Sequence, residues 1–329
     1  MDLFFGRGIK FTPSKDVPSL AGKVILVTGA NNGLGKQSVL DLARYGKPAF
    51  IWLAARSPER AAQALADINA QLDLEPNAED SDRTVIKTVE LDLALLASVR
   101  AAAQRVTAET PGPRLDILML NAGIMSTPPG LTADGYEIQF GTNHLGHALL
   151  AKLLLPMLLQ TAAAHPDVRV VVLSSVGHTQ APKAGGAPGE AGIMFSGLKT
   201  EQAALGALPR YGQSKLANLL FARELARRYP AQLRVAAVDP GLASTGLANN
   251  LESRALRTVV NSLRFLYPSP ADAVRGPLWA ATAQPPDFIE SGAYYKPLGR
   301  RGSDSPYAND ELAAKLWEWT ENELQAYTL

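Results

Sequence analysis

A tyrosine and a lysine one helical turn apart are residues whose spacing suggests chemistry. Tyr211 and Lys215 stand in the stretch YGQSK, and residues at positions i and i+4 of a helix lie on the same face. A phenol has a pKa of about 10, too high for efficient proton transfer at neutral pH, and a neighbouring ammonium favours the phenolate. The pair therefore suggests an acid–base catalyst, although an ordinary helical Tyr–Lys pair has the same spacing.

A glycine-rich stretch, TGANNGLG, follows a short β-branched run near the start of the chain. Gly29 would allow a tight turn, Gly33 would let the backbone approach a pyrophosphate, and Gly35 would permit close packing of a helix on a strand. The N-terminus of that helix would present free N–H groups to the anion. The spacing Gly-x-x-x-Gly-x-Gly predicts a dinucleotide site, and the alternative is a turn without a ligand. The residues expected to line the site are Gly29, Asn31, Asn32, Gly33, Leu34 and Gly35.

The ribose of such a cofactor is expected at the end of the second strand, about 20 residues after the glycine-rich stretch. Arg56 stands 56 − 35 = 21 residues after Gly35, and the stretch LAARS around it has no carboxylate. A guanidinium can bind a 2′-phosphate through paired hydrogen bonds, whereas a carboxylate would repel it. We therefore expect NADP(H) rather than NAD, with a solvated surface arginine as the alternative. Asp92, followed by Leu93, could accept from the adenine amino group and could also cap a helix.

Short β-branched runs alternate with longer amphipathic stretches along the chain. Strands of five or six residues that alternate with helices of ten or more predict βαβ units and a doubly wound parallel α/β sheet with helices on both faces. The predicted strands are Val24–Thr28, Phe50–Ala54, Thr84–Leu91, Leu115–Leu120, Arg169–Leu173 and Leu233–Val238. The predicted helices are Gly33–Tyr45, Pro58–Leu72, Ala97–Glu109, Asp134–Leu159, Tyr211–Tyr229, Ala271–Thr282 and a terminal helix with Trp317 and Trp319.

Three segments do not fit this alternation. Residues 1–20 look like an N-terminal arm ahead of a single domain at 21–329. Residues 178–209, rich in Gly, Ala and Pro, separate a strand from its helix, and residues 246–270 separate the sixth strand from the next helix. Insertions of this kind at strand ends are usually binding loops or lids.

We expect the insertion at 178–209 to be a mobile lid over the substrate. Its hinges would be Gly185, Gly186 and Gly189, and its apolar surface would be Ile193, Met194 and Phe195. A surface excursion that covers a sheet end is the alternative.

Composition removes several classes of protein and site. The 329 residues include no Cys, which excludes disulfides, thiolate nucleophiles, iron–sulfur clusters and Cys-based zinc sites. The four His residues lack metal-ligand spacing, so we expect no metal and interpret them as packing residues, with His178 the best placed to touch a substrate. Lys and Arg total 32 against 31 Asp and Glu, which gives no attraction to nucleic acid. No signal sequence or uninterrupted membrane-spanning stretch is evident, so we expect a soluble cytoplasmic protein.

Five motifs occur in an order that resembles the short-chain dehydrogenase/reductase family. They are TGANNGLG, Asn121-Ala122-Gly123 after the fourth strand, Ser174-Ser175 after the fifth, YGQSK, and Asp239-Pro240-Gly241 after the sixth. The stretches DGYEIQFGTNHLGHALL and YGQSKLANLLFARELARRYP are similar to the retinol-dehydrogenase-like branch and its fungal relatives. The resemblance implies a single-domain Rossmann-type fold and hydride transfer between NAD(P) and an alcohol or ketone.

The resemblance also implies roles, residue by residue. Tyr211 matches the catalytic acid–base, Lys215 its partner that also binds the cofactor ribose, and Ser175 the serine that polarises the substrate carbonyl. Asn143 matches the asparagine that anchors a water leading to the lysine. Ser175 and Tyr211 are 211 − 175 = 36 residues apart, longer than in the simplest members. The matching cofactor positions are Asn121, Ala122, Gly123, Pro240, Gly241 and Thr245.

Together these features predict an NADPH-dependent oxidoreductase, a carbonyl reductase or alcohol dehydrogenase that acts on a bulky apolar ketone, aldehyde or secondary alcohol. Two alternatives remain: a non-catalytic NADP-binding sensor or scaffold, and a biosynthetic enzyme that uses the same pocket for dehydration or cyclisation. The expected partner is a small-molecule carbonyl or alcohol, with no nucleic acid and no membrane span. A homodimer is left open.

Overall fold

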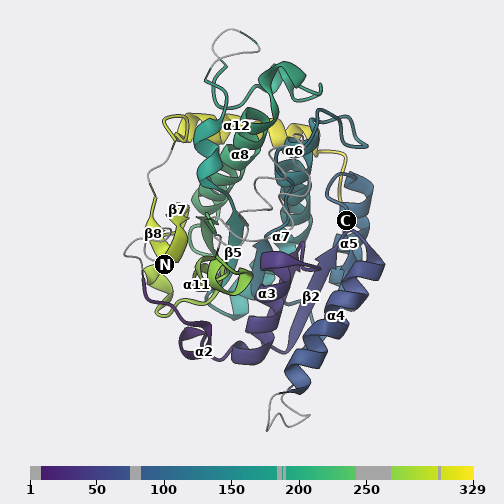
Figure 1. Ribbon diagram of the computed structural model, residues 1–329, viewed down its shortest axis with the longest axis vertical. Helices are drawn as coiled ribbons and strands as arrows, with labels where there is room; N and C mark the ends of the chain where they lie inside the picture. The colour runs from purple at the N-terminus through teal and green to yellow at the C-terminus, as the bar shows by residue number, and fades with distance from the viewer. Residues whose placement is uncertain (1–8, 75–82, 184–186, 188–189, 242–267, 303–304) are drawn as a thin grey trace.

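The computed structural model in Figure 1 describes residues 9–74, 83–183, 187, 190–241, 268–302 and 305–329. In this part of the chain an eight-stranded sheet has the order β3-β2-β1-β4-β5-β6-β7-β8, and its strands pair in parallel except β7 with β8. The strands are β1 Val24–Thr28, β2 Phe50–Ala55, β3 Val85–Glu90, β4 Ile117–Leu120, β5 Val168–Leu173, β6 Leu233–Val238, β7 Ala293–Lys296 and β8 Arg300–Arg301. The predicted doubly wound fold is confirmed, and each predicted strand ends within two residues of the observed one.

The helices alternate with the strands as predicted. The α-helices are α2 Pro13–Asp16, α3 Gly33–Asp41, α4 Pro58–Asp73, α5 Leu96–Glu109, α6 Ile138–Phe140, α7 Gly146–Ala164, α8 Ala207–Arg228, α10 Pro270–Ala273, α11 Arg275–Thr282 and α12 Asp310–Glu323. The π turns are η1 Leu42–Gly46 and η3 Gly141–Leu145. The 3₁₀ turns are η4 Val176–Gln180, η5 Phe195–Gly197, η6 Ala203–Leu205, η9 Pro286–Phe288 and η10 Pro297–Gly299.

Both faces of the sheet are covered by helices (Figure 1). In β1, Val24 and Leu26 belong to a core with α5, α7 and α8, whereas Ile25 and Val27 belong to a second core with α3, α4 and α11. Alternate residues of a strand point to opposite faces, so a strand buried on both sides must be apolar throughout. This explains why the central strands β1, β4 and β5 consist mostly of Val, Ile and Leu.

The helix predicted at Asp134–Leu159 begins later than expected and contains a π turn. Asp134 Oδ2 instead accepts a hydrogen bond from the Leu96 N–H at 2.8 Å at the start of α5, and Gly135 has a φ of +83°. Glu137 then caps α6 by accepting from the Phe140 N–H at 2.7 Å. The π turn η3 follows, and α7 extends to Ala164. The helix predicted at Ala271–Thr282 is likewise divided, into α10 and α11.

The stretch Ile138–Ala164 is long and apolar enough to cross a membrane by length and composition alone. Its residues Leu149, Leu150 and Leu154 are fully buried in the core against the sheet. We therefore interpret it as a core helix.

Two strands were not predicted. The strand β7 has four residues and pairs with β6, while β8 has two residues and turns back against β7. Such short segments carry too few alternating residues to be distinguished from a turn. Together they cover the edge of the sheet next to β6.

The described part of the expected N-terminal arm packs against the domain. Phe11, Val17 and Leu20 are buried in the second core, and the Ile9 N–H donates to the Leu298 carbonyl at 2.8 Å. An apolar residue every few positions is enough to bury this segment, although its sequence has no regular period.

The described part of the insertion 178–209 also packs inward. Ile193 and Met194 are buried, and the ring centroid of Phe195 lies 6.2 Å from that of Trp319 on α12. These three residues therefore do not offer the apolar surface expected for a substrate, because two of them are buried and Phe195 packs against α12. The expected hinges Gly185, Gly186 and Gly189, and most of the loop 246–270, lie outside the described residues.

The terminal helix α12 lies across α8, as Figure 1 shows. The ring of Trp317 stacks on Phe221 of α8, with 5.7 Å between centroids and 10° between planes. The guanidinium of Arg228 lies 4.7 Å from the ring centroid of Trp317. With α12 in place, α8 is buried against both the sheet and the C-terminal helix.

Candidate active site

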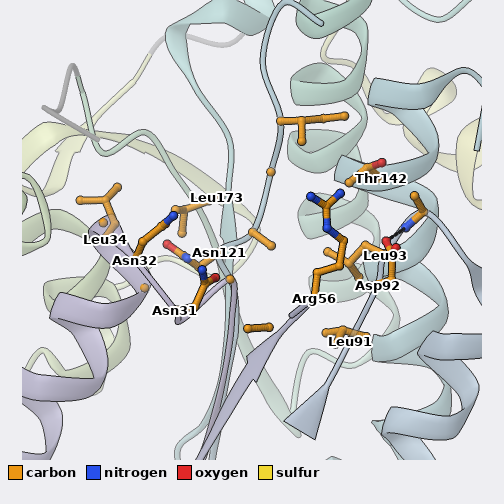
Figure 2. Close-up of a pocket in the computed structure, with 18 of the residues that line it drawn as sticks. Asn31, Asn32, Leu34, Arg56, Leu91, Asp92, Leu93, Asn121, Thr142 and Leu173 are labelled. Atoms are coloured by element: carbon orange, nitrogen blue, oxygen red, sulfur yellow. Dashed lines mark hydrogen bonds between the residues drawn. The ribbon is translucent and has the colours of Figure 1, made fainter. Parts of the chain in front are cut away.

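A cavity of about 760 Å³ opens at the carboxyl ends of the parallel strands. Figure 2 shows Asn31, Asn32 and Leu34 on one side of it, Arg56 and Asp92 on the other, and Asn121 between them. Each strand from β1 to β6 contributes a loop, so the cavity lies where parallel sheets bind ligands. The predicted site residues that line it are Gly29, Asn31, Asn32, Gly33, Leu34, Gly35, Arg56, Asp92, Leu93, Asn121, Ala122, Gly123, Tyr211, Lys215 and Pro240.

Three predicted residues are not part of this lining, and one cannot be placed. Asn143 and Ser175 contact the lining residues Ile124 and Tyr211, and Gly241 follows Pro240 in the chain. Gly241 has a φ of +77° and donates its N–H to Asp239 Oδ1 at 2.8 Å, which shapes the turn after β6. Thr245 lies outside the described residues.

Two glycines of the glycine-rich loop stand where the chain is packed too closely for a side chain. Gly29 has a φ of +64°, and a Cβ atom there would lie 2.9 Å from the Cα of Ala122. A Cβ atom at Gly35 would collide with the Gly29 carbonyl and lie 2.6 Å from Asn121 Nδ2. The helix α3 starts at Gly33 without a side-chain cap, so the N–H groups of its first turn remain available to an anion.

A buried polar atom without a hydrogen-bond partner also supports the fit of this cavity to a dinucleotide. Asn121 donates through Nδ2 to the Thr28 carbonyl at 2.8 Å, while its Oδ1 is buried and has no hydrogen-bond partner among the described residues. Buried acceptors are rarely left unpaired in folded proteins. Asn121 lies beside the glycine-rich loop, so its free acceptor fits a dinucleotide, whose ribose hydroxyls can donate hydrogen bonds.

Two arginines stand where the 2′-position of such a cofactor is expected. Arg56 and Arg60 both line the cavity and are exposed, and neither has a carboxylate partner in the described part of the chain. Ser57 accepts from the Arg60 N–H at 3.2 Å and begins α4 between them. Arg60 was missed from the sequence, although its position four residues after Arg56 could have indicated it.

Asp92 orders its own loop and does not cap α5. Its Oδ1 accepts from the Ala94 N–H at 2.9 Å, and its N–H donates to Ser98 Oγ at 3.0 Å. The residue before α5 is Leu95, and Asp134 serves the first turn instead. The second carboxylate oxygen of Asp92 faces no described donor, which leaves it available on the cavity wall.

The hydroxyls of Ser175 and Tyr211 lie within reach of each other. Ser175 Oγ also accepts from the Gly177 N–H at 3.1 Å. A Cβ atom at Gly177 would lie 2.7 Å from Tyr211 Cε1, so a side chain there would displace the ring. Lys215 Nζ donates to the Leu173 carbonyl at 3.0 Å and lies 5.7 Å from the Tyr211 ring centroid. These contacts bring Ser175, Tyr211 and Lys215 together as predicted.

Burial dominates the electrostatics of this cluster. Burial raises the pKa of Tyr211 to about 12; its hydrogen bond to Ser175 opposes the rise, and the charge of Asp239 adds to it. Burial lowers the pKa of Lys215 to about 8, and Asp239 opposes that change. The expectation that Lys215 lowers the pKa of Tyr211 is therefore wrong, because the ammonium is directed at the Leu173 carbonyl and the phenol is desolvated.

Asn143 lies in the π turn η3 and has every side-chain hydrogen-bonding group engaged. Its Oδ1 accepts from the Ile124 N–H at 2.8 Å, and its Nδ2 donates to the Ile124 carbonyl and to Ser214 Oγ, each at 2.9 Å. Ser214 Oγ in turn donates to the Tyr211 carbonyl at 2.8 Å. Asn143 thus joins the loop after β4 to the first turns of α8.

The fold, the cleft and the hydroxyl pair agree with known proteins. A family model described as short chain dehydrogenase matches residues 23–188. The chain belongs to the short-chain dehydrogenase/reductase family. The family binds nicotinamide cofactors, and its members are oxidoreductases, so the resemblance predicted from the five motifs is confirmed.

Relatives of this short-chain dehydrogenase/reductase come from fungi and from the retinol dehydrogenases. The chain is 37% identical over 324 residues to short-chain dehydrogenase/reductase drtF of Aspergillus calidoustus, covering 94% of this chain and 96% of that one. It is 35% identical over 315 residues to mouse retinol dehydrogenase 12, covering 95% and 89%. A solved structure of an uncharacterized protein from Mycobacterium paratuberculosis is 30% identical with a TM-score of 0.68, covering 97% and 98%.

Two histidines of this family member do not lie as expected. His178 is buried with its Nδ1 2.6 Å from the Ser175 carbonyl and its ring 4.8 Å from that of Tyr294, so it faces the interior and does not line the cavity. The 3₁₀ turn η4 directs it there. His147, interpreted as a packing residue, hydrogen-bonds to both Thr28 and Asn143. Within the described ranges no group of three or more His, Asp or Glu side chains is placed to hold a metal ion.

A fully buried ion pair beside the site was also missed from the sequence. Arg210 Nη1 lies 2.9 Å from Glu137 Oε1, and its Nη2 donates to the carbonyl of Thr127 at 2.8 Å. Arg210 directly precedes Tyr211, and Glu137 caps the helix that leads to Asn143. The pair therefore fixes α8 against α6 next to the cavity.

Proposed function

We propose that this protein is an NADPH-dependent carbonyl reductase of the short-chain dehydrogenase/reductase family. The observation that carries the proposal is the pair of neighbouring hydroxyls of Ser175 and Tyr211, with Lys215 beside them, at a cavity whose glycine-rich loop fits a dinucleotide. A sensor or scaffold that kept only the fold would have no use for buried proton donors at this position.

When bound, NADPH supplies the hydride that the carbonyl carbon gains. Tyr211 stays protonated at neutral pH because burial raises its pKa to about 12, so its hydroxyl can donate a proton to the carbonyl oxygen as the alcohol forms. The Ser175 hydroxyl donates a hydrogen bond to the same oxygen as negative charge builds on it. Lys215, whose Nζ lies 5.7 Å from the Tyr211 ring centroid, would hold the cofactor ribose, and solvent returns the proton to Tyr211.

We propose NADPH and not NADH because of the charge at the end of β2. Arg56 and Arg60 line the cavity there without a carboxylate to compete for them in the described chain. Two guanidiniums can bind a 2′-phosphate through several charge-assisted hydrogen bonds. The first-turn N–H groups of α4 add favourable potential.

We propose a bulky, apolar ketone or aldehyde as substrate. Ile124, Pro128 and Ile138 line the cavity beyond the residues assigned to the cofactor. An apolar wall favours an apolar ligand through burial of surface. The names of the relatives called retinol dehydrogenase agree with a substrate of this kind.

The test of the function is a panel of apolar ketones and aldehydes, with product analysis in the presence and absence of NADPH, on the parent and on Tyr211→Phe. The variant keeps the ring and its packing but has no proton to give, so we expect at least a hundred-fold loss of turnover with unchanged NADPH affinity. Turnover within a few-fold of the parent would show that another group is the acid. A product formed without NADPH would indicate dehydration or cyclisation, and NADPH binding without any product would indicate a sensor.

The test of the cofactor is titration of NADPH and NADH against Arg56→Ala and Arg60→Ala. Each lost charge-assisted hydrogen bond is worth about 1.5–3 kcal/mol, so the Kd for NADPH should rise at least about ten-fold while that for NADH stays constant. Arg105→Ala, which removes an exposed arginine paired with Glu109 on α5, is the control. Equal losses for both cofactors, or a parent that binds NADH more tightly, would contradict the assignment.

A further inference from the structure

His147 is a buried side chain with a hydrogen-bonding partner at each ring nitrogen. It is the second residue of α7, is 1% exposed and does not line the cavity. Its Nδ1 lies 2.9 Å from the carbonyl oxygen of Asn143, and its Nε2 lies 2.9 Å from Thr28 Oγ1. Thr28 ends β1, directly before the glycine-rich loop, and Asn143 lies in the π turn η3. The imidazole therefore joins the end of β1 to the π turn η3.

The partners leave one assignment of the imidazole protons. A carbonyl oxygen can only accept, so Nδ1 carries the hydrogen that Asn143 receives. Thr28 Oγ1 accepts from the Asn121 N–H at 2.9 Å and from the Ala122 N–H at 3.0 Å, which uses both of its lone pairs. Its own hydrogen must then be donated, and Nε2 at 2.9 Å is a closer acceptor than the Met119 carbonyl at 3.4 Å. The ring is the neutral Nδ1–H tautomer.

A second proton on the His147 ring would have no acceptor. It would place an Nε2–H next to Thr28 Oγ1, whose two lone pairs already accept hydrogen bonds. Burial lowers the pKa of His147 to about 4; the Asn143 carbonyl opposes this and the nearby charge of Lys215 adds to it. His147 is thus excluded as an acid–base catalyst at neutral pH. Any contribution it makes to the site must come from the positions in which it holds Thr28 and Asn143.

Each partner belongs to a different half of the site. Thr28 holds the turn at Asn121 and Ala122, both of which line the cavity, and Asn121 Oδ1 is buried with no described partner. Asn143 holds the Ile124 peptide and, through Ser214, the carbonyl of Tyr211. The hydrogen bonds thus connect Thr28, at the end of β1, to the second turn of α8, which carries Tyr211. π turns are frequent at functional sites, and here the turn places the Asn143 carbonyl within reach of the ring.

We propose that His147 is a positioning residue which, as the neutral Nδ1–H tautomer, links the dinucleotide-binding loop at Thr28 to Asn143 and keeps the two halves of the site in register. The link to turnover rests on the proposed reductase function. The links to cofactor binding and to the tautomer do not.

Two substitutions separate the two ends of the ring. An Asn side chain places its amide near the position of Nδ1, and a Gln side chain reaches toward Nε2. His147→Asn should keep the bond to the Asn143 carbonyl and lose that to Thr28, so the Kd for NADPH should rise about ten-fold with kcat within about three-fold of the parent. His147→Gln should show the reverse, a kcat lowered about ten-fold with little change in Kd.

His144 provides the matched control one turn earlier. It is equally buried, but its Nε2 lies 3.2 Å from Thr320 Oγ1 of α12 and its ring packs against Phe140 and Phe221. His144→Asn and His144→Gln should lower the melting temperature without separating Kd from kcat. If the two His147 variants change Kd and kcat together, in step with their melting temperatures as the His144 variants do, the role is structural and the proposal fails.

The tautomer can be read on the unaltered protein. Nitrogen-15 NMR of the histidine-labelled, cofactor-free enzyme should show a protonated Nδ1 and an unprotonated Nε2 for His147, assigned by loss of the signals in His147→Gln, with no titration from pH 8 to pH 5. A protonated Nε2, or a ring that titrates near its ordinary pKa of about 6.5, would overturn the proposal even if no enzymatic activity is found.

Discussion

Lys215→Met should make the cofactor-free protein more stable while abolishing its turnover. Burial lowers the pKa of Lys215 from 10.5 to about 8, and each unit of pKa difference between folded and unfolded states is worth about 1.4 kcal/mol. A charged lysine at this position therefore costs about 3 kcal/mol at pH 7. Met gives up a hydrogen bond worth about 1 kcal/mol, but Asn218 still donates to the Leu173 carbonyl at 2.9 Å. The expected net gain is about 2 kcal/mol in the free energy of unfolding.

The pH dependence makes this prediction specific. The unfolded chain keeps the lysine proton up to about pH 10.5 and the folded chain only to about pH 8, so the penalty is fully present below pH 8 and disappears as the pH rises toward 10.5. Urea unfolding of parent and variant at pH 7 and pH 10 measures the difference, and other titrating groups cancel. Lys87→Met on β3, a half-exposed site, should stay within about 0.5 kcal/mol at both pH values. A variant less stable than the parent at pH 7, or a gain that persists undiminished at pH 10, refutes the reasoning.

Two further perturbations test the surroundings of the site. Arg210→Met should lower the free energy of unfolding by about 3–5 kcal/mol, because Glu137 stays buried without its cation. Adding Glu137→Gln should restore most of that loss. A double variant that is no more stable than Arg210→Met in urea unfolding would contradict this. Burial and then the charge of Asp239 raise the pKa of Tyr211, so Asp239→Asn should move the alkaline limb of the reduction pH profile to lower pH. Tyr294→Phe, which keeps that carboxylate, should leave the limb in place, and an equal shift in both variants would exclude the charge effect.

The sequence placed most of the cleft because chain order and parallel strands are enough to do so. Residues that follow parallel strands meet at one edge of the sheet, so Gly35, Arg56, Asp92 and Asn121 could be brought together without any knowledge of distances. The i, i+4 spacing placed Lys215 beside Tyr211 because residues four apart lie on the same face of a helix.

What the sequence could not supply were contacts between distant segments and the effects of burial. The partners Glu137 and Arg210 are separated by 73 residues, and His147 is 119 residues from Thr28, so no local pattern marks either pair. The spacing of Tyr211 and Lys215 gives proximity but not desolvation, which is the larger effect on the phenol. Nearness in sequence also misled, since His178 follows Ser175 by three residues yet turns inward.

The cover that α12 forms over α8 has a consequence for how the enzyme is made. The ribosome completes α8 at Arg228 and reaches α12 at Asp310, which is 310 − 228 = 82 residues later. At synthesis rates of about 5–20 residues per second, this interval lasts roughly 4–16 s. During that time the α8 surface around Phe221, on which Trp317 later stacks, is exposed in the nascent chain. The Phe221 face of α8 is thus an apolar surface that stays uncovered until α12 is made, so a chain released before α12 should be prone to aggregate.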